Sequence, residues 1–457
     1  MRESEPPQRE QWGTKIGFIL AAAGSAIGLG NVWKFPYITG ENGGAAFVFV
    51  YLLCIIIIGL PIMLAELTIG RRTQRNPVGA FKVLKPNSPW FLVGSLGVLA
   101  GFVLLSYYSV VAGWMISYTL KAATGVFQNF LAPESAGQHF TQFAANPGWS
   151  LLFHALFMFL CVLIVMKGIK GGIERWSKIL MPVLFMILIL LLLRGLTLPG
   201  AAKGLAFLFK PDFGSLSPRA ALIALGHAFF TLSLGMGAMI TYGSYMSRSD
   251  NIPYNGVMVV FLDTLIALLA GVAIFTSVFA MKLDPTAGPG LVFHVLPAVF
   301  QKMPGGILFA TLFFLLMSIA ALTSGISLLE VVSAYFIDER GWRRQQAVTL
   351  MGALIFLIGI PSALSFGVMR DLTYFFKMNF FDFVDFLSAN YLLPIGGLLI
   401  AVFTGWVLGT RKAVEEIRHG NPKFTSAPYW GFLIRFISPI AVLIIIGAVV
   451  IGGVRFN

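Results

Sequence analysis

Long apolar runs, separated by short polar stretches, make up most of this chain. A helix that crosses a lipid bilayer needs roughly 20 apolar residues, and about eleven runs of that kind occur. Their centres lie near residues 25, 58, 105, 158, 187, 230, 268, 320, 355, 398 and 442. Hydrophobic residues form 57% of the chain and charged residues only 11%, which excludes a string of soluble domains. The pattern predicts an all-α integral membrane protein of about eleven transmembrane helices.

Two of these runs contain small and polar residues at matching places. The first holds AAAGSAIGLGN over residues 21–31, and the sixth holds HAFFTLSLGMGAMITY over residues 227–242. Paired interruptions of this kind indicate two broken helices in an inverted 5+5 repeat, with spans 1–5 mirrored by spans 6–10. A broken helix leaves backbone groups that are costly in hydrocarbon unless something polar satisfies them. The breaks therefore predict a bound ion or zwitterion; the alternative is that Gly24 and Gly28 serve only close helix packing.

Lysine and arginine gather after the even-numbered spans, and this distribution orients the chain. The residues are Arg71, Arg72, Arg75, Lys82, Lys85, Lys167, Lys170, Arg175, Lys178, Arg340, Arg343, Arg344, Arg411, Lys412, Arg418 and Lys423. Because positively charged loops stay in the cytoplasm, we expect a multi-pass plasma-membrane protein with a cytoplasmic N-terminus and an extracellular C-terminus. The net charge of +13 is explained in this way, so no nucleic-acid partner is predicted.

The short connections predict one continuous unit with small additions at its ends. Residues 1–14 are expected to form a cytosolic tail, residues 15–409 the inverted-repeat core, and residues 410–457 a cytosolic loop and the last span. Residues 284–302 are apolar but too short and too rich in proline to span the bilayer. We expect them to form a re-entrant or capping segment on the outer face.

Oxygen-bearing side chains lie in or near the spans and form a candidate cation site. Asp263 is near the middle of span 7, where an ionisable group is costly and a functional role is the default; a neutral structural carboxyl is the alternative. Asn31, Thr231, Thr323 and Ser324 supply further oxygens. A hard cation such as sodium takes oxygen ligands, and the N–H groups at half-helix ends suit a carboxylate. These residues predict sodium ions and an amino acid as ligands.

Charged residues at the membrane edges are candidate gates. Lys34 and Asp385 are expected to pair on the outer side, and Arg9 and Asp338 on the inner side. The alternative is that these are ordinary interfacial charges.

Two further acidic residues, Glu66 in span 2 and Glu330 in span 8, are expected to carry a proton or to hydrogen-bond the broken backbone. No catalytic constellation accompanies them. The two cysteines, Cys54 and Cys161, lack metal-ligand spacing. The sequence therefore argues against an enzyme.

Five segments together resemble the signatures of one family of transporters. They are WGTKIGFILAAAGSAIGLGNVWKFPYITGENGGAAF, LAELTIGRR, SYYSVVAGW, AFFTLSLGMGAMITYGSY and AALTSG. The chain is similar, over nearly its whole length, to the sodium-coupled neurotransmitter transporters in their bacterial branch. Asp263, Met236 and the number of spans most resemble a bacterial carrier of many hydrophobic amino acids.

The resemblance implies two sodium sites and one substrate site. The first sodium site would use Ala26, Asn31, Thr231 and Asp263 with the substrate carboxylate, and the second Gly24, Ile27, Ala320, Thr323 and Ser324. The implied substrate site consists of Ala26, Leu29, Gly30, Leu104, Tyr108, Phe230, Thr231, Ser233, Met236, Ser324 and Leu328.

Three positions distinguish this chain within the pattern of that family. Gly28 stands where carriers of monoamines have an aspartate, which favours an amino acid that brings its own carboxylate. Ala267 stands where relatives have a serine or a glutamate, so Asp263 would supply the negative charge and transport would be independent of chloride. Lys34 replaces an arginine of the outer gate and loses its bidentate geometry.

The resemblance also implies moving parts on the inner side. Trp12 and Tyr245 would join the Arg9–Asp338 pair in an inner gate. Local unwinding between Gly172 and Pro182 would admit water to the second sodium site.

The sequence thus predicts a secondary transporter that couples two Na⁺ ions to the import of hydrophobic, aliphatic and aromatic, L-amino acids by alternating access. A membrane sensor or a channel on the same scaffold is the alternative. Nothing in the sequence fixes the oligomeric state.

Overall fold

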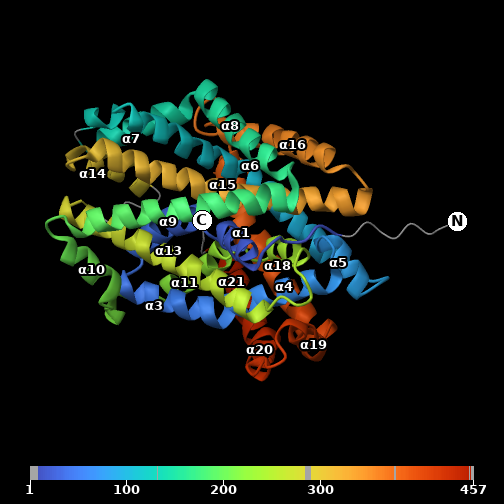
Figure 1. Ribbon diagram of the computed structural model, residues 1–457. Coiled ribbons are helices and arrows are strands. Elements are labelled where there is room, and N and C mark those ends of the chain that lie inside the picture. The colour runs from blue at the N-terminus through green and yellow to red at the C-terminus, as the bar shows by residue number, and fades with distance from the viewer. Residues whose placement is uncertain (1–8, 131, 284–289, 375–376, 452, 454–457) are drawn as a thin grey trace.

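The computed structural model describes residues 9–130, 132–283, 290–374, 377–451 and 453, and shows a bundle of helices packed side by side (Figure 1). Within these residues, nine helices are long and apolar enough to cross a membrane. The first five are Ala45–Thr73 (α3, Ala45–Cys54; η2, Ile55–Gly59; α4, Leu60–Thr73), α6 (Phe91–Ala123), α8 (Pro147–Val165), Ile169–Leu196 (η4, Ile169–Glu174; α9, Arg175–Leu196) and α13 (Ile252–Ala280). The others are α15 (Gly306–Arg340), α16 (Arg344–Leu364), Phe380–Val407 (α17, Phe380–Leu387; η8, Ser388–Leu392; α18, Leu393–Val402; η9, Phe403–Val407) and Ala427–Val450 (α20, Ala427–Phe432; η10, Leu433–Ile437; α21, Ser438–Val450).

Two more spans are broken, as the sequence predicts. Span 1 consists of α1 (Lys15–Ala26), the π-helical turn η1 (Gly30–Lys34) and α2 (Phe35–Glu41), with a bend of 51° at the break. Span 6 consists of α11 (Pro218–Thr231) and α12 (Ala238–Gly243), each too short to cross a membrane alone. With the nine unbroken spans, these account for the predicted number of transmembrane segments.

Backbone geometry explains the two breaks. Ile27 ends α1 in an extended conformation, with φ −73° and ψ 101°. In span 6, Ser233, Gly235 and Gly237 have φ values of 54°, 82° and 75°, a left-handed conformation that no helix can continue through. Glycine is required at Gly235 for a second reason, because a Cβ atom there would meet the carbonyl oxygen of Leu393.

The alternative role of the span 1 glycines, close packing, is also present. A Cβ atom on Gly28 would lie 2.5 Å from the Ser324 hydroxyl oxygen and 3.0 Å from that of Tyr108. A Cβ atom on Gly24 would lie 3.2 Å from the Thr323 Cβ. Gly24 and Gly28 therefore let α15 approach span 1, while the chain direction changes at Ile27.

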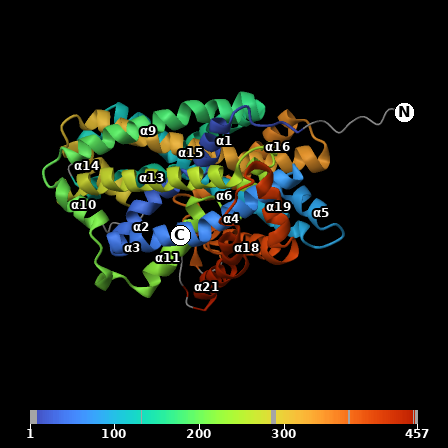
Figure 2. The ribbon, with the colours of Figure 1, turned by 60° about the horizontal axis from the view of Figure 1, so that its bottom comes forward.

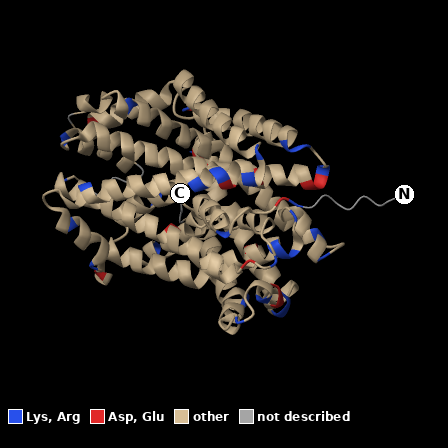
Figure 3. Ribbon diagram, viewed as in Figure 1, with Lys and Arg blue, Asp and Glu red and all other residues tan. Residues whose placement is uncertain are grey.

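Short helices cap the two ends of the bundle. One end, called the α5 end here, carries α5 (Pro77–Leu84) and α19 (Thr410–Gly420), and the other, the α7 end, carries α7 (Pro133–Ala145), α10 (Ala201–Phe209) and α14 (Leu296–Lys302) (Figures 1 and 2). The short helical turns are η3 (Val126–Asn129), η5 (Phe213–Ser215) and η6 (Leu291–Val295). Charged residues gather toward the α5 end, and most of the helical ribbon carries none (Figure 3).

Two segments singled out in the sequence can be located in this frame. Residues 290–302 of the expected capping segment form η6 and α14, and residues 284–289 lie outside the described residues. The stretch from Gly172 to Pro182 is helical, with Gly172 in the π-helical turn η4 and Pro182 inside α9. A Cβ atom on Gly172 would collide with the Ile164 carbonyl oxygen, so glycine is needed there for packing against α8.

Candidate functional site

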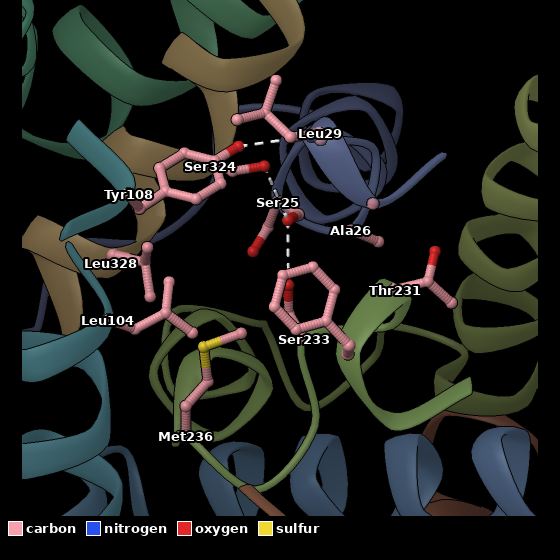
Figure 4. A pocket seen from close by; sticks show the side chains of 13 residues that line it. Ser25, Ala26, Leu29, Leu104, Tyr108, Thr231, Ser233, Met236, Ser324 and Leu328 are labelled. Atoms are coloured by element: carbon pink, nitrogen blue, oxygen red, sulfur yellow. Dashed lines mark hydrogen bonds between the residues drawn. The ribbon is translucent and has the colours of Figure 1, made fainter. Parts of the chain in front are cut away.

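A narrow cavity lies in the middle of the bundle where the two broken spans meet α6 and α15 (Figure 4). Its volume is about 340 Å³. Its lining consists of Ser25, Ala26, Gly28, Leu29, Gly30, Leu104, Tyr108, Phe230, Thr231, Ser233, Met236, Ser324 and Leu328. The structure thus brings all the residues of the implied substrate site into one cavity, although they come from four separate spans.

One side of this central cavity is polar because of the break in span 1. The Leu29 N–H group lies 3.4 Å from the Tyr108 hydroxyl oxygen, toward which it points. Ser233 donates a hydrogen bond of 2.9 Å to the Ser25 carbonyl. The opposite side is formed by the apolar side chains of Leu104, Met236 and Leu328 (Figure 4). A molecule with a polar head and an apolar side chain matches this arrangement.

A first cluster of oxygens lies beside the cavity, around Asn31. The Asn31 side-chain nitrogen lies 2.7 Å from Asp263 Oδ1, 3.1 Å from the Asp263 carbonyl oxygen and 3.1 Å from Thr231 Oγ1. Thr231 Oγ1 lies in turn 3.1 Å from Asp263 Oδ1, and the Asn31 side-chain oxygen accepts a bond of 3.0 Å from the Gly28 N–H group. All three side chains are buried. The break in span 1 therefore faces a buried carboxyl group on α13.

A second cluster of oxygens lies between span 1 and α15. Ser324 Oγ is 3.5 Å from the Gly24 carbonyl oxygen, 3.2 Å from that of Ser25 and 3.4 Å from that of Ile27. Thr323 Oγ1 is 3.0 Å from the Ala320 carbonyl oxygen. These are carbonyls at the end of α1, the Ala320 carbonyl and the two hydroxyls of α15, so the cluster is rich in oxygen and carries no formal charge.

At the α5 end, the residues before α1 close the bundle. Arg9 forms an ion pair with Asp338 and donates a bond of 3.1 Å to Ser244 Oγ, and its guanidinium lies 4.6 Å from the centre of the Tyr245 ring. The Trp12 backbone N–H donates to the Tyr245 carbonyl at 3.1 Å. These contacts bind the chain before span 1 to the residues after α12 and to the end of α15.

Next to the central cavity lies a second one, which we call the outer cavity because Lys34 and Asp385, the residues expected to form the outer gate, line it. Its lining also includes Trp33, Tyr37 and the aromatic ring of Phe230. The Lys34 ammonium lies 4.7 Å from the centre of the Phe230 ring, a distance at which a cation is attracted to an aromatic face. Phe230, Leu29 and Tyr108 also line the central cavity, so these three residues separate the two spaces.

The two glutamates singled out in the sequence have different partners. Glu66 Oε1 accepts a hydrogen bond of 2.8 Å from Gly235 N, so it holds the broken backbone of span 6 as expected. For Glu330 the expected hydrogen bond to the broken backbone is wrong: its carboxylate accepts from the Tyr245 hydroxyl at 2.6 Å and from Arg344 at 2.7 Å. The reason is the position of Glu330 on α15, which is closer to the Arg9 cluster than to either break.

Sequence reasoning missed Ser25 as a lining residue. Its carbonyl accepts from Ser233 and Ser324, and its hydroxyl donates to Ser327 at 2.7 Å. Ser25 carries the one hydroxyl in the interrupted stretch of span 1, and this could have marked it as a lining residue.

Comparison with known proteins gives consistent results over almost the whole chain. The sequence profile of the sodium:neurotransmitter symporter family matches residues 9–143 and 139–454. An uncharacterized sodium-dependent transporter of Bacillus subtilis is 44% identical over 446 residues, which cover 97% of this chain and 98% of the relative. Another uncharacterized sodium-dependent transporter, from Haemophilus influenzae, is 37% identical over 450 residues, which cover 96% of this chain and 97% of the relative.

A solved structure gives the same result for the fold. The crystal structure of MhsT in complex with L-phenylalanine superposes with a TM-score of 0.88 at 50% identity, covering 96% of this chain and 99% of that one. The predicted all-helical membrane fold with broken spans is thereby confirmed, and so is the family resemblance. The chain belongs to the sodium:neurotransmitter symporter family, a family of membrane symporters and not of enzymes.

Proposed function

We propose that this protein imports hydrophobic L-amino acids, aliphatic and aromatic, by coupling their entry to the inward movement of two sodium ions across the plasma membrane. The observation that carries the proposal is the central cavity, which is polar at the break of span 1 and apolar on the opposite side. A relative of 50% identity has been solved with L-phenylalanine, a ligand of this polarity.

The substrate would bind with its charged groups at the break. The N–H groups of Leu29 and Gly30 and the Tyr108 hydroxyl suit the carboxylate, because the start of a half-helix carries partial positive charge. The carbonyls of Ala26, Phe230 and Thr231 and the Ser233 hydroxyl would receive the ammonium group. The apolar side chain would then face Leu104, Met236, Ser324, Leu328 and the Phe230 ring, which line the same cavity.

The two oxygen clusters would hold the two ions. The Asn31 cluster, with the Ala26 carbonyl and Thr231, contains the Asp263 carboxyl group and adjoins the substrate carboxylate position, so substrate and ion would stabilise one another there. The cluster formed by Gly24, Ile27, Ala320, Thr323 and Ser324 would hold the second ion through carbonyls and hydroxyls. Two charges moving down 100 mV release roughly 4.6 kcal/mol, enough for about a thousandfold accumulation.

The closures on both sides of the cavity suit alternating access. Lys34, Asp385 and the Phe230 ring would form the outer gate, and Arg9, Trp12, Tyr245 and Asp338 the inner one. Unwinding between Gly172 and Pro182 would release the second ion toward the cytoplasm. In this arrangement residues 15–409 are the transport core, the N-terminal tail is cytoplasmic and the C-terminus extracellular.

Uptake into proteoliposomes tests the proposal. We expect radiolabelled L-leucine and L-tryptophan to accumulate under an inward sodium gradient, with or without chloride, and not with equal sodium on both sides or with choline in its place. Asn31→Ala is expected to abolish accumulation, while Asn255→Ala, which removes a buried asparagine on α13 outside both clusters, serves as the control. Saturable binding without accumulation would point instead to a sensor, and flux without concentration to a channel.

A further inference from the structure

A large cavity at the α7 end is separate from the transport path. Its volume is about 960 Å³, including the part that is open to the surroundings. It lies where α6 ends and α8 begins, with α7 between them, and its lining consists of Ser117, Leu120, Lys121, Thr124, His139, Gln142, Phe143, Asn146, Trp149 and Phe153. None of these residues lines the central or the outer cavity. We call it the α7 cavity.

The α7 cavity contains a cation that has no carboxylate to neutralise it within the described part of the chain. Lys121 is half-buried, and its ammonium lies 3.0 Å from His139 Nε2 and 3.7 Å from the centre of the Phe143 ring. No carboxylate of the described residues forms an ion pair with Lys121, and the lining includes no Asp or Glu.

His139 does not compensate this charge. Its burial, and then the neighbouring Lys121 charge, lower the pKa of His139, so the imidazole is neutral at pH 7. An ammonium group can only donate, so Nε2 accepts from it and the ring proton is on Nδ1. The α7 cavity therefore presents one positive charge and several neutral polar groups.

The surroundings of the α7 cavity are those of a membrane surface. Leu120, Trp149 and Leu152 have exposed fractions of 54%, 52% and 53%, and they lie at the ends of the two spans α6 and α8. Large apolar side chains exposed there face acyl chains, and a tryptophan at the start of a span is typical of the headgroup level. A ligand that enters the α7 cavity from the side thus meets lipid-facing apolar surface first and the ammonium behind it.

From this geometry we propose that the α7 cavity binds the phosphate headgroup of an anionic phospholipid, with Lys121 as the charged contact. The neutral side chains of His139, Gln142 and Asn146 would hydrogen-bond the rest of the headgroup. The acyl chains would lie over Leu120 and Trp149. A zwitterionic headgroup is disfavoured, because the cavity offers no carboxylate to its ammonium group.

A lipid bound beside α7 would also affect the segment next to the outer cavity. On α7, one residue from His139, Phe140 stacks on Phe293 of η6, with ring centres 4.4 Å apart. Phe293 in turn contacts Trp33, a lining residue of the outer cavity, at 5.9 Å. A headgroup held between α6 and α7 would therefore steady the segment that adjoins the outer cavity.

Native mass spectrometry of the full-length protein, offered phosphatidylglycerol or phosphatidylcholine, tests this proposal independently of transport. We expect retained phosphatidylglycerol in the wild type, and about fivefold weaker retention in Lys121→Gln, the effect of one lysine on an anionic headgroup. Lys121→Arg should keep the preference. Lys203→Gln, on the exposed side of α10 at the same end of the bundle, is the matched control and should behave as the wild type.

Hydrogen exchange supplies a second measurement on the same proteins. Phosphatidylglycerol should slow exchange in residues 133–145 of the wild type and not of Lys121→Gln. Equal retention of the two lipids, or equal retention by wild type and Lys121→Gln, would overturn the proposal. Displacement of the lipid by millimolar glycerol phosphate would show a site for soluble phosphates and would overturn the assignment to a lipid.

Discussion

The role of Asp263 in ion binding is open to a direct test by Asp263→Asn. The substitution keeps the shape of a fully buried side chain (0% exposed), removes its negative charge and replaces one carboxylate oxygen by an amide NH2 group. Because Asp263 Oδ1 lies 2.7 Å from the Asn31 nitrogen and 3.1 Å from Thr231 Oγ1, an ion held among these groups would be within about 4 Å of the carboxylate. At an effective dielectric constant of about 20, that attraction amounts to about 4 kcal/mol.

A loss of this size corresponds to a roughly thousandfold weaker affinity for sodium at this cluster. The assay is binding of tritiated L-leucine to purified protein as a function of sodium concentration, with chloride replaced by gluconate. In Asp263→Asn, the sodium concentration that gives half-maximal leucine binding should rise above the range that the assay can reach. Chloride should not restore it, since Ala267 provides no hydroxyl for an anion.

The matched control is Thr276→Val on the same helix. This buried hydroxyl bonds only its own helix, at 2.7 Å to the Val272 carbonyl and 3.3 Å to that of Ala273. The Thr276→Val substitution should therefore leave the sodium dependence of leucine binding unchanged. An Asp263→Asn protein with the sodium dependence of the wild type would refute the reasoning, because the carboxylate would then contribute nothing to the ion.

Three further predictions concern the central cavity, the contacts of Arg9 at the α5 end, and α9. Met236→Phe places a rigid ring on the apolar wall of the narrow central cavity. In a competition-binding assay, the affinity for tryptophan should fall about tenfold, while the affinity for leucine stays nearly unchanged. Arg9→Ala removes the ion pair with Asp338 and the bond to Ser244, and hydrogen exchange in residues 9–26 should become faster; unchanged exchange would argue against an inner gate. Pro182→Ala restores a backbone donor inside α9, and should slow uptake while sparing sodium-dependent binding, which separates ion release from ion binding.

The sequence alone determined the number of spans, their order and the two breaks. Apolar length is a local property, because every backbone group of a spanning helix bonds within its own segment. Glycine and serine inside AAAGSAIGLGN and HAFFTLSLGMGAMITY mark the breaks for the same local reason. A carboxyl group in the middle of an apolar span, Asp263, likewise stands out without any knowledge of its neighbours.

Spacing along the sequence does not show which groups meet; apart from what the family resemblance implied, only the tertiary structure decided this. Asn31 and Asp263 are 232 residues apart, and Ser324 lies 299 residues from the Ser25 carbonyl that it contacts. Ser25, and the pairing of Glu330 with Tyr245 and Arg344, could not be found by spacing. Hydropathy says that a residue is in a span, but the face it turns to its neighbours depends on how all the spans pack. The central cavity and the α7 cavity both arise from that packing, since each is lined by residues of several separate helices.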